Sequence, residues 1–269
     1  MSQPLALRRA ILLLTLALPG FCWGGPSLQA LIVNDGTAGL ETNVTTNLSA
    51  DLVLAGYAVT TNVGVPGGSL AGYSQVWDIR YNNTTPLTGS DITAYIGYMA
   101  GGGSLFVMGE NTGFVTRNNT IVTLISSAGG GSVSVTTPNN NENIFAPFSG
   151  PNAVSTITFL AAAGIPSPPG HGNYVTKDSS NIGAAVVFSP GTLLNALNGS
   201  LIVVFDVNFM DPTADANSQA LLKNLIAYLA APTPIVPVVP FIPAPSSLLL
   251  LLTGLAAAGL FVARRKLRA

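Results

Sequence analysis

Four carboxylates stand at or near the ends of apolar runs that are typical of buried strands: Asp35, Asp78, Glu110 and Asp206. If these strands are parallel, their carboxyl ends share one edge of the sheet, which is where ligands bind in open α/β sheets. Carboxylates gathered at that edge could hold a hard cation such as Ca²⁺. They could also supply the acid and base of glycoside hydrolysis, with Glu110 paired to Asp78 or Asp206.

The alternative is structural, and it is the favoured interpretation. Each carboxylate can cap the turn or helix that follows it, because Asp and Asn are common where a strand turns into a helix. Four further residues could reach the same cleft, with the same alternative use: Asn111, Asn208, Asp211 and Asp215.

The sequence lacks the arrangement of residues that nucleophilic catalysis by a serine and a histidine usually needs. The single histidine, His171, lies in a Pro/Gly-rich stretch (168–173) that is typical of an exposed loop. The sequence contains no Gly-x-Ser-x-Gly elbow that could present a serine to it.

The charge balance argues against nucleic acid as a partner. Only 8% of the residues are charged, against roughly 25% in an average soluble protein. Between residues 26 and 230, four basic side chains face eleven acidic ones, a net charge of about −7. Binding to phosphates needs clustered bases, which this segment does not have.

The elements that position these side chains alternate between strand-like and helix-like segments. Strands are predicted over 30–35, 58–63, 75–80, 104–109, 184–189 and 200–206. Helices are predicted over 40–56, 90–101 (capped by Ser90 or Asp91), 118–128 and 216–229. Residues 132–136 are expected to be extended, and 138–183 to form an irregular insertion with a strand at 156–160. Continuous apolar strands alternating with helices predict an α/β fold with a mostly parallel sheet that is covered on both faces.

Three stretches carry a resemblance to a known family. They are 30–35, 101–111, and 204–209 with the helix that follows. Together they resemble class I glutamine-amidotransferase-like domains, which implies a flavodoxin-like three-layer sandwich over residues 26–230. Catalytic members carry a cysteine at the turn after the second stretch, where this chain has Glu110 or Asn111. We expect no cysteine-dependent amidotransferase reaction, because no thiolate can form there.

The N-terminus has the pattern of a secretory signal peptide. Arg8 and Arg9 precede a short apolar run, and small residues, Cys22 and Gly24, precede the expected cleavage point. Processing by the Sec translocon and signal peptidase would leave a mature chain that starts near residue 26 and contains no thiol.

The C-terminus predicts a membrane anchor in three parts. A proline-rich linker over 231–245 is followed by an uncharged run over 246–263, close to the length of a transmembrane helix. The tail over 264–269 carries four basic residues, which places it in the cytoplasm and the large domain on the far side of the membrane.

The order of Pro243, Ala244 and Pro245, an apolar helix and a basic tail resembles the PEP-CTERM sorting signal of Gram-negative bacteria, with Ala244 at the position where that family usually has Glu. The resemblance implies an exosortase-type sorting enzyme as partner and delivery from the inner membrane to the cell surface or extracellular matrix. A simple C-terminal membrane anchor is the alternative.

Three functions therefore stay open. The first is a surface-sorted, non-catalytic domain that binds polysaccharide or a partner. The second is a carbohydrate-active hydrolase that uses Glu110, and the third is a structural component of the biofilm matrix. No cofactor is evident apart from the Ca²⁺ considered above.

Overall fold

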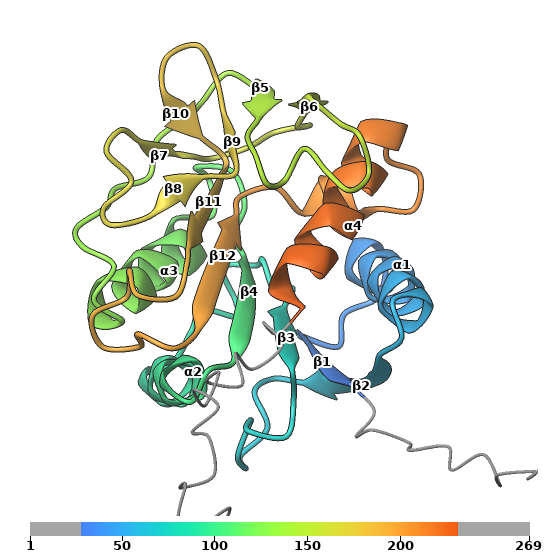
Figure 1. The fold of residues 1–269 in the computed structure, drawn as a ribbon, viewed down its shortest axis with the longest axis vertical. Coiled ribbons are helices and arrows are strands. Elements are labelled where there is room, and N and C mark those ends of the chain that lie inside the picture. Colours follow the sequence, from blue (N-terminus) through green and yellow to red (C-terminus); the bar gives the residue numbers. More distant parts are fainter. Residues whose placement is uncertain (1–27, 231–269) are drawn as a thin grey trace, which may run out of the picture.

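A seven-stranded sheet of order β2-β1-β3-β4-β12-β11-β8 forms the centre of the computed structural model, which describes residues 28–230 (Figure 1). Its strands are β1 (Gln29–Asn34), β2 (Ala58–Val63), β3 (Gln75–Asp78), β4 (Ser104–Met108), β8 (Asn173–Tyr174), β11 (Ala185–Phe188) and β12 (Ser200–Val204). The five strands from β2 to β12 pair in parallel, and β11 is antiparallel to both of its neighbours. The predicted α/β class with a mostly parallel sheet is confirmed.

Helices cover both faces of this sheet. Helices α1 (Leu40–Leu54) and α4 (Ala216–Leu229) pack on one face, and α2 (Gly89–Ala100) and α3 (Val115–Ser127) on the other (Figure 1). Successive residues of β4 point in opposite directions, so that Phe106 contacts the first layer and Leu105 the second. Because both layers exclude water, every residue of β4 is buried, which explains its continuous apolar run.

The predicted insertion at 138–183 contains more regular structure than expected. It forms a three-stranded sheet of β5 (Asn141–Ile144), β6 (Thr156–Thr158) and β9 (Thr176–Lys177), and a pair of β7 (Ile165–Pro166) with β10 (Ile182–Gly183). The buried Glu142 carboxylate accepts hydrogen bonds from the Ala184 amide at 3.0 Å and from the Thr176 hydroxyl, which joins the small sheet to the chain that enters β11. The extended segment expected at 132–136 is reduced to one bridge between Thr136 and Gly164.

Two helix starts differ from the predictions. Helix α2 is capped by Thr88, because the Thr88 hydroxyl accepts from the Asp91 amide while the Asp91 carboxylate accepts from the Thr88 amide. Helix α3 starts at Val115, three residues earlier than expected. There the Asn83 side-chain oxygen accepts from the Thr116 and Arg117 amides, a cap supplied from a distant part of the chain.

The predicted terminal segments lie outside the described residues. They are the signal peptide (1–25), the linker with Pro243, Ala244 and Pro245 (231–245), the transmembrane helix (246–263) and the basic tail (264–269). Within residues 28–230, no helix is both long enough and apolar enough to span a bilayer.

Candidate functional site

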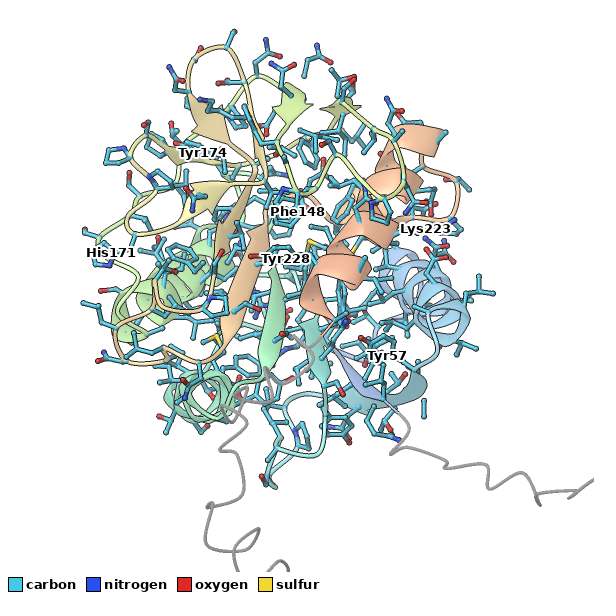
Figure 2. All side chains as sticks on the ribbon, viewed as in Figure 1. Tyr57, Phe148, His171, Tyr174, Lys223 and Tyr228 are labelled. Carbon is cyan, nitrogen blue, oxygen red and sulfur yellow. The ribbon has the colours of Figure 1, made fainter. Side chains whose placement is uncertain are left out.

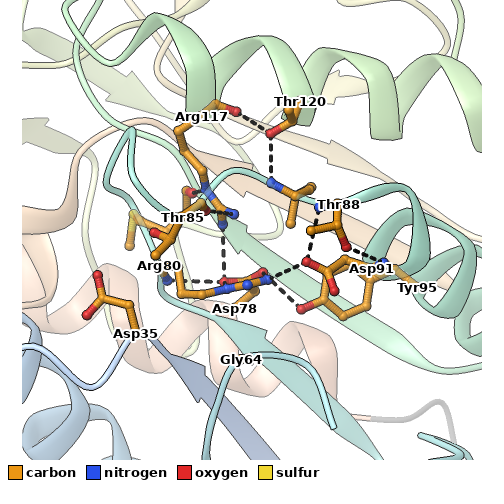
Figure 3. Close-up of polar contacts among 12 residues, drawn as sticks. Asp35, Gly64, Asp78, Arg80, Thr85, Thr88, Asp91, Tyr95, Arg117 and Thr120 are labelled. Carbon is orange, nitrogen blue, oxygen red and sulfur yellow. Dashed lines mark hydrogen bonds and ion pairs between the residues drawn. The ribbon is translucent and has the colours of Figure 1, made fainter. Parts of the chain in front are cut away.

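Asp78, the last residue of β3, lies in a buried ion cluster rather than at an open edge (Figure 3). Its Oδ2 accepts hydrogen bonds from Arg80 Nη2 at 2.7 Å and from the Tyr95 hydroxyl at 2.9 Å. Its Oδ1 lies 3.1 Å from Nη2 of Arg117, whose side chain is also fully buried. Burial alone would raise the pKa of Asp78, but the two guanidinium groups hold it below its usual value.

The two arginines tie this cluster to the surrounding elements. Arg117 donates from Nε to the Met108 carbonyl at 3.1 Å and from Nη1 to the Thr85 carbonyl at 3.2 Å. Arg80 also lies 3.3 Å from Asp91 in the first turn of α2. The cluster is structural, and sequence reasoning missed it. The available signal was that these arginines are two of only four bases in an acidic segment.

Asp206 is a buried cap, as the structural alternative predicted. Its Oδ1 accepts from the Asn208 amide at 2.7 Å at the start of the 3₁₀ helix η1 (Val207–Met210). Its Oδ2 accepts from the Leu160 and Ala161 amides at 2.7 and 3.2 Å, and none of the residue is exposed. Asp206 and Asp78 are thus both fully buried and already hydrogen-bonded, which argues against either of them acting with Glu110 on a substrate.

Glu110 lies in the turn after β4, where the family resemblance places a nucleophile. Its Oε2 accepts from the Val207 amide at 2.9 Å, and its Oε1 from the backbone and side-chain amides of Asn111 at 3.0 and 3.2 Å. Only 3% of the residue is exposed, and burial raises the pKa of Glu110 to about 7, with the charge of Asp206 adding to the shift. Asn111 in turn accepts from the Gly113 amide. The turn thus satisfies its own polar groups.

Asp35, after β1, forms a pair with Glu41 in the first turn of α1. The Asp35 amide donates to Glu41 Oε1 at 2.8 Å, and the Thr37 hydroxyl donates to Oε2 at 2.9 Å. Burial, followed by the contact with Asp35, raises the pKa of Glu41 to about 7. Partial burial alone would raise the pKa of Asp35, but hydrogen bonds from Glu41 and Thr37 lower it below its usual value. The interaction between these two side chains thus shifts their pKa values in opposite directions, and sequence reasoning did not identify Glu41.

Tyr81 lies near two of the predicted carboxylates. Burial raises its pKa, and the charges of Glu41, Asp35 and Glu110 raise it further. Its ring packs against Phe114 with the centroids 5.9 Å apart. Asp35 and Glu110 therefore act on a common neighbour, Asp206 acts on Glu110, and Asp78 is held in the arginine cluster. Among residues 28–230, no group of three or more His, Cys, Asp or Glu side chains could hold a metal ion.

Three of the predicted residues come together in an open groove of about 780 Å³, but none of the four carboxylates whose cleft they were expected to join lines it. Asn208, Asp211 and Asp215 line one side, from η1 to the cap of α4. The opposite side is lined by 139–141 and 158–160 from the insertion, to which the sequence analysis assigned a strand at 156–160 but no site residue.

Several polar groups of this groove are available to a ligand. Asn141 accepts from the Thr158 hydroxyl through Oδ1, and Asn139 accepts from the Asn141 amide through Oδ1. Asp215 accepts from the Ser218 amide through Oδ1. Within the described part of the chain, the side-chain NH₂ groups of Asn139 and Asn141 and the second oxygen of Asp215 make no hydrogen bond. All three residues are exposed.

His171 lies at the surface, as expected (Figure 2). One of its ring nitrogens, Nδ1, lies 3.1 Å from the Gly129 carbonyl, and its amide donates to the Gly130 carbonyl. Both contacts fix the loop against the end of α3, so we assign the histidine a packing role.

Comparison with known proteins gives a likeness of fold. No protein-family model and no curated protein matches the sequence. Among solved structures, the chain is similar to the N-terminal domain of mmIFT52, with a TM-score of 0.55 and 11% identity over 76% of this chain and 98% of that one. It is also similar to a ThuA-like protein from Bacteroides uniformis, with a TM-score of 0.52 and 14% identity over 79% of this chain and 95% of that one. Likenesses at these identities concern the fold alone.

We expect Asp78→Asn to destabilise the protein by about 3–5 kcal/mol, because it leaves two buried guanidinium groups without their shared anion. Urea denaturation followed by circular dichroism measures the loss. Asp51→Asn is the comparison, since the Asp51 side chain is also largely buried but its cation, Lys223, is half-exposed and 4.0 Å away, so its loss should cost much less than that of Asp78. Equal effects of the two substitutions would show that the cluster is not a stabilising unit.

We expect stability to fall as the pH rises from about 5 to 8. Burial raises the pKa values of Glu41, Glu110 and Glu142 to about 7 in the folded protein, well above the usual range of a glutamate. The folded state therefore binds more protons than the unfolded state in this window, and the stability present at low pH is lost as pH passes through the raised pKa. The free energy of unfolding of the wild type should be lower at pH 8 than at pH 5, and Glu110→Gln should reduce this difference by about 2–3 kcal/mol. Denaturation curves at the two pH values measure it. Parallel pH profiles for the wild type and the variant would disprove this.

Proposed function

We propose that the chain is an exported, surface-sorted protein whose α/β domain binds extracellular polysaccharide without catalysing a reaction. The observation that carries this proposal is the groove between the insertion and the η1–α4 segment. Its volume of about 780 Å³ lies in the range of ligand sites, roughly 300–1,000 Å³. Its free amide donors and carboxylate oxygen complement sugar hydroxyls, which both donate and accept hydrogen bonds.

The lining of the groove favours a neutral polymer. Asp211 and Asp215 contribute negative charge, and no basic side chain lines the groove. An anionic polymer would therefore be repelled there. Leu160, which is 72% exposed, also lines the groove and offers an apolar contact for the C–H face of a sugar ring.

We favour binding over hydrolysis because the buried carboxylates already have ion-pair or hydrogen-bond partners. Asp78 is neutralised by Arg80 and Arg117, and Asp206 is occupied by three backbone amides. Glu110 has a pKa suited to an acid, but glycoside hydrolysis needs a second carboxyl group facing the same bond. These contacts leave Glu110 without the partners that the hydrolase hypothesis required.

We also propose that the layers are arranged as in flavodoxin-like domains. The parallel strand order β2-β1-β3-β4-β12 matches the order of flavodoxin-like domains. With the Glu110–Asn111 turn directly after β4, it supports an amidotransferase-like three-layer sandwich that lacks the nucleophile.

Export and sorting rest on the sequence of the two ends. The Sec translocon and signal peptidase would act on 1–25, and an exosortase-type enzyme on the segment that contains Pro243, Ala244 and Pro245. Until that cleavage, the segment 246–263 would hold the precursor in the inner membrane. The product would be a cell-surface or matrix protein of a Gram-negative bacterium.

Polysaccharide binding is tested by affinity electrophoresis in gels that contain neutral glucans, mannans or galactans. The double variant Asn141→Ala/Asp215→Ala removes a donor and an acceptor and should weaken retention by about tenfold or more. Asn119→Ala, on the exposed side of α3, is the control and should be retained like the wild type. Absence of retention by every neutral polymer, or equal retention of both variants, would refute the proposal.

Export is tested by mass spectrometry of the protein isolated from its native cells. We expect a mature N-terminus close to residue 25 and loss of the C-terminal apolar segment and basic tail, because both ends match processing signals. A protein with both ends intact would contradict the sorting proposal. Loss of the N-terminal segment alone would favour the simple anchor.

A further inference from the structure

Lys177 differs from the other basic residues in the described part of the chain. Arg80 and Arg117 pair with Asp78, and Lys223 lies 4.0 Å from Asp51. Lys177 forms no ion pair with a carboxylate of residues 28–230. Its ammonium instead lies 5.3 Å from the ring centroid of Phe145 and 5.4 Å from that of Tyr174. A partly buried cation between two rings, in an acidic domain, is free to meet an external anion.

These groups line a pocket of about 320 Å³ that is separate from the polar groove. Its walls include the following aromatic and polar residues: Phe145, Phe148, Tyr174, Lys177, Ser189 and Tyr228. Val187 of β11 also lines it. The pocket thus lies at the antiparallel end of the sheet, between α4 and the insertion, where Figure 2 shows Phe148, Tyr228 and Tyr174.

Hydrogen bonds on several sides preform the pocket. The Asn224 side chain in α4 donates to the Phe148 and Asn152 carbonyls at 2.8 Å, which holds the loop that carries Phe148. The Phe148 and Tyr228 ring centroids are 4.6 Å apart, and the Tyr228 and Ser189 hydroxyls are joined at 2.8 Å. A site fixed in this way loses little conformational entropy when a ligand binds.

The chemistry of the lining defines the ligand. The aromatic faces provide a surface for a flat or C–H-rich ring, and the ammonium provides one point of attraction for an anion. The exposed side chain of Asn173 and the remaining hydrogen-bonding capacity of the Ser189–Tyr228 hydroxyl pair favour a ring that carries polar groups over a wholly apolar one. A polyphosphate is disfavoured because it needs several cations or amide donors, and the pocket has a single cation.

We propose that this pocket binds a carboxylate-bearing sugar unit, a uronate, with Lys177 contacting the carboxylate and the aromatic rings contacting the sugar. The volume suits one ring rather than a long segment of polymer. The proposal goes beyond the neutral-polymer groove and does not depend on it, because the two sites share no lining residue.

Isothermal titration of the full-length protein with a uronate trisaccharide tests the proposal, with the neutral trisaccharide of the same linkage and benzoate as comparison ligands. The wild type should bind the uronate at least about tenfold more tightly than either comparison ligand. Lys177→Gln should weaken uronate binding by about 10–100-fold, and Lys177→Arg should retain most of it because the charge is kept.

Lys223→Gln is the matched control, since it removes the same charge outside the pocket and should leave the affinity unchanged. Phe145→Ala, at a residue that is 38% exposed, should weaken binding while the melting temperature stays close to that of the wild type. The groove variant Asn141→Ala/Asp215→Ala should bind uronate normally, which separates this site from the proposed function. Equal affinities of Lys177→Gln and Lys223→Gln, no binding by the wild type at millimolar ligand, or equal binding of benzoate would each overturn the inference.

Discussion

A buried negative charge at the end of β3 fixes the arrangement of the carboxyl edge. Asp78 cannot lie in this interior unless its charge is balanced, and Arg80 and Arg117 provide that balance. Arg117 comes from α3 and bonds to the last carbonyl of β4, so the same contact sets the position of α3 relative to two adjacent strands. The Glu110 turn begins two residues after that carbonyl. The contact of Arg117 with Met108 therefore constrains where this turn begins.

This constraint explains why the edge offers so little to a ligand. In open parallel sheets the carboxyl edge is the usual binding site, yet here the polar groups nearest the strands hold the scaffold together. The Asp206 carboxylate accepts a hydrogen bond from Leu160 in the insertion, and the Glu110 carboxylate accepts one from Val207 at the start of η1. The free polar groups and the unpaired cation lie farther out, where the insertion meets η1, β11 and α4. Ligand binding is thus expected on the part of the chain that departs from the regular α/β pattern.

The layered core could be predicted from the sequence because buried positions are occupied by apolar residues, whose spacing differs between strands and helices. The apolar run of β4 and the helical spacing of α4 both follow from contacts on the two faces of the sheet. The start of α3 was wrong because its cap comes from Asn83, about thirty residues earlier, and no local pattern records such a contact. The role of Asp78 was missed for the same reason, since Arg117 approaches it only after folding. Asn208, Asp211 and Asp215 do lie together because all three follow one strand closely, but they line a groove away from the four carboxylates whose cleft they were expected to join.

Helix α4 connects the groove and the pocket for which we propose ligands. Asp215 at its N-cap lines the polar groove, and Tyr228 near its end lines the aromatic pocket. At a rise of 1.5 Å per residue, these two positions are separated by about 20 Å along the helix. A single polymer with neutral and acidic units could therefore reach both surfaces, and the second contact would form at a high effective concentration once the first had formed. Opposite charge preferences at the two ends of one helix would then select a heteropolymer over a chain of either unit alone, because each homopolymer satisfies only one surface.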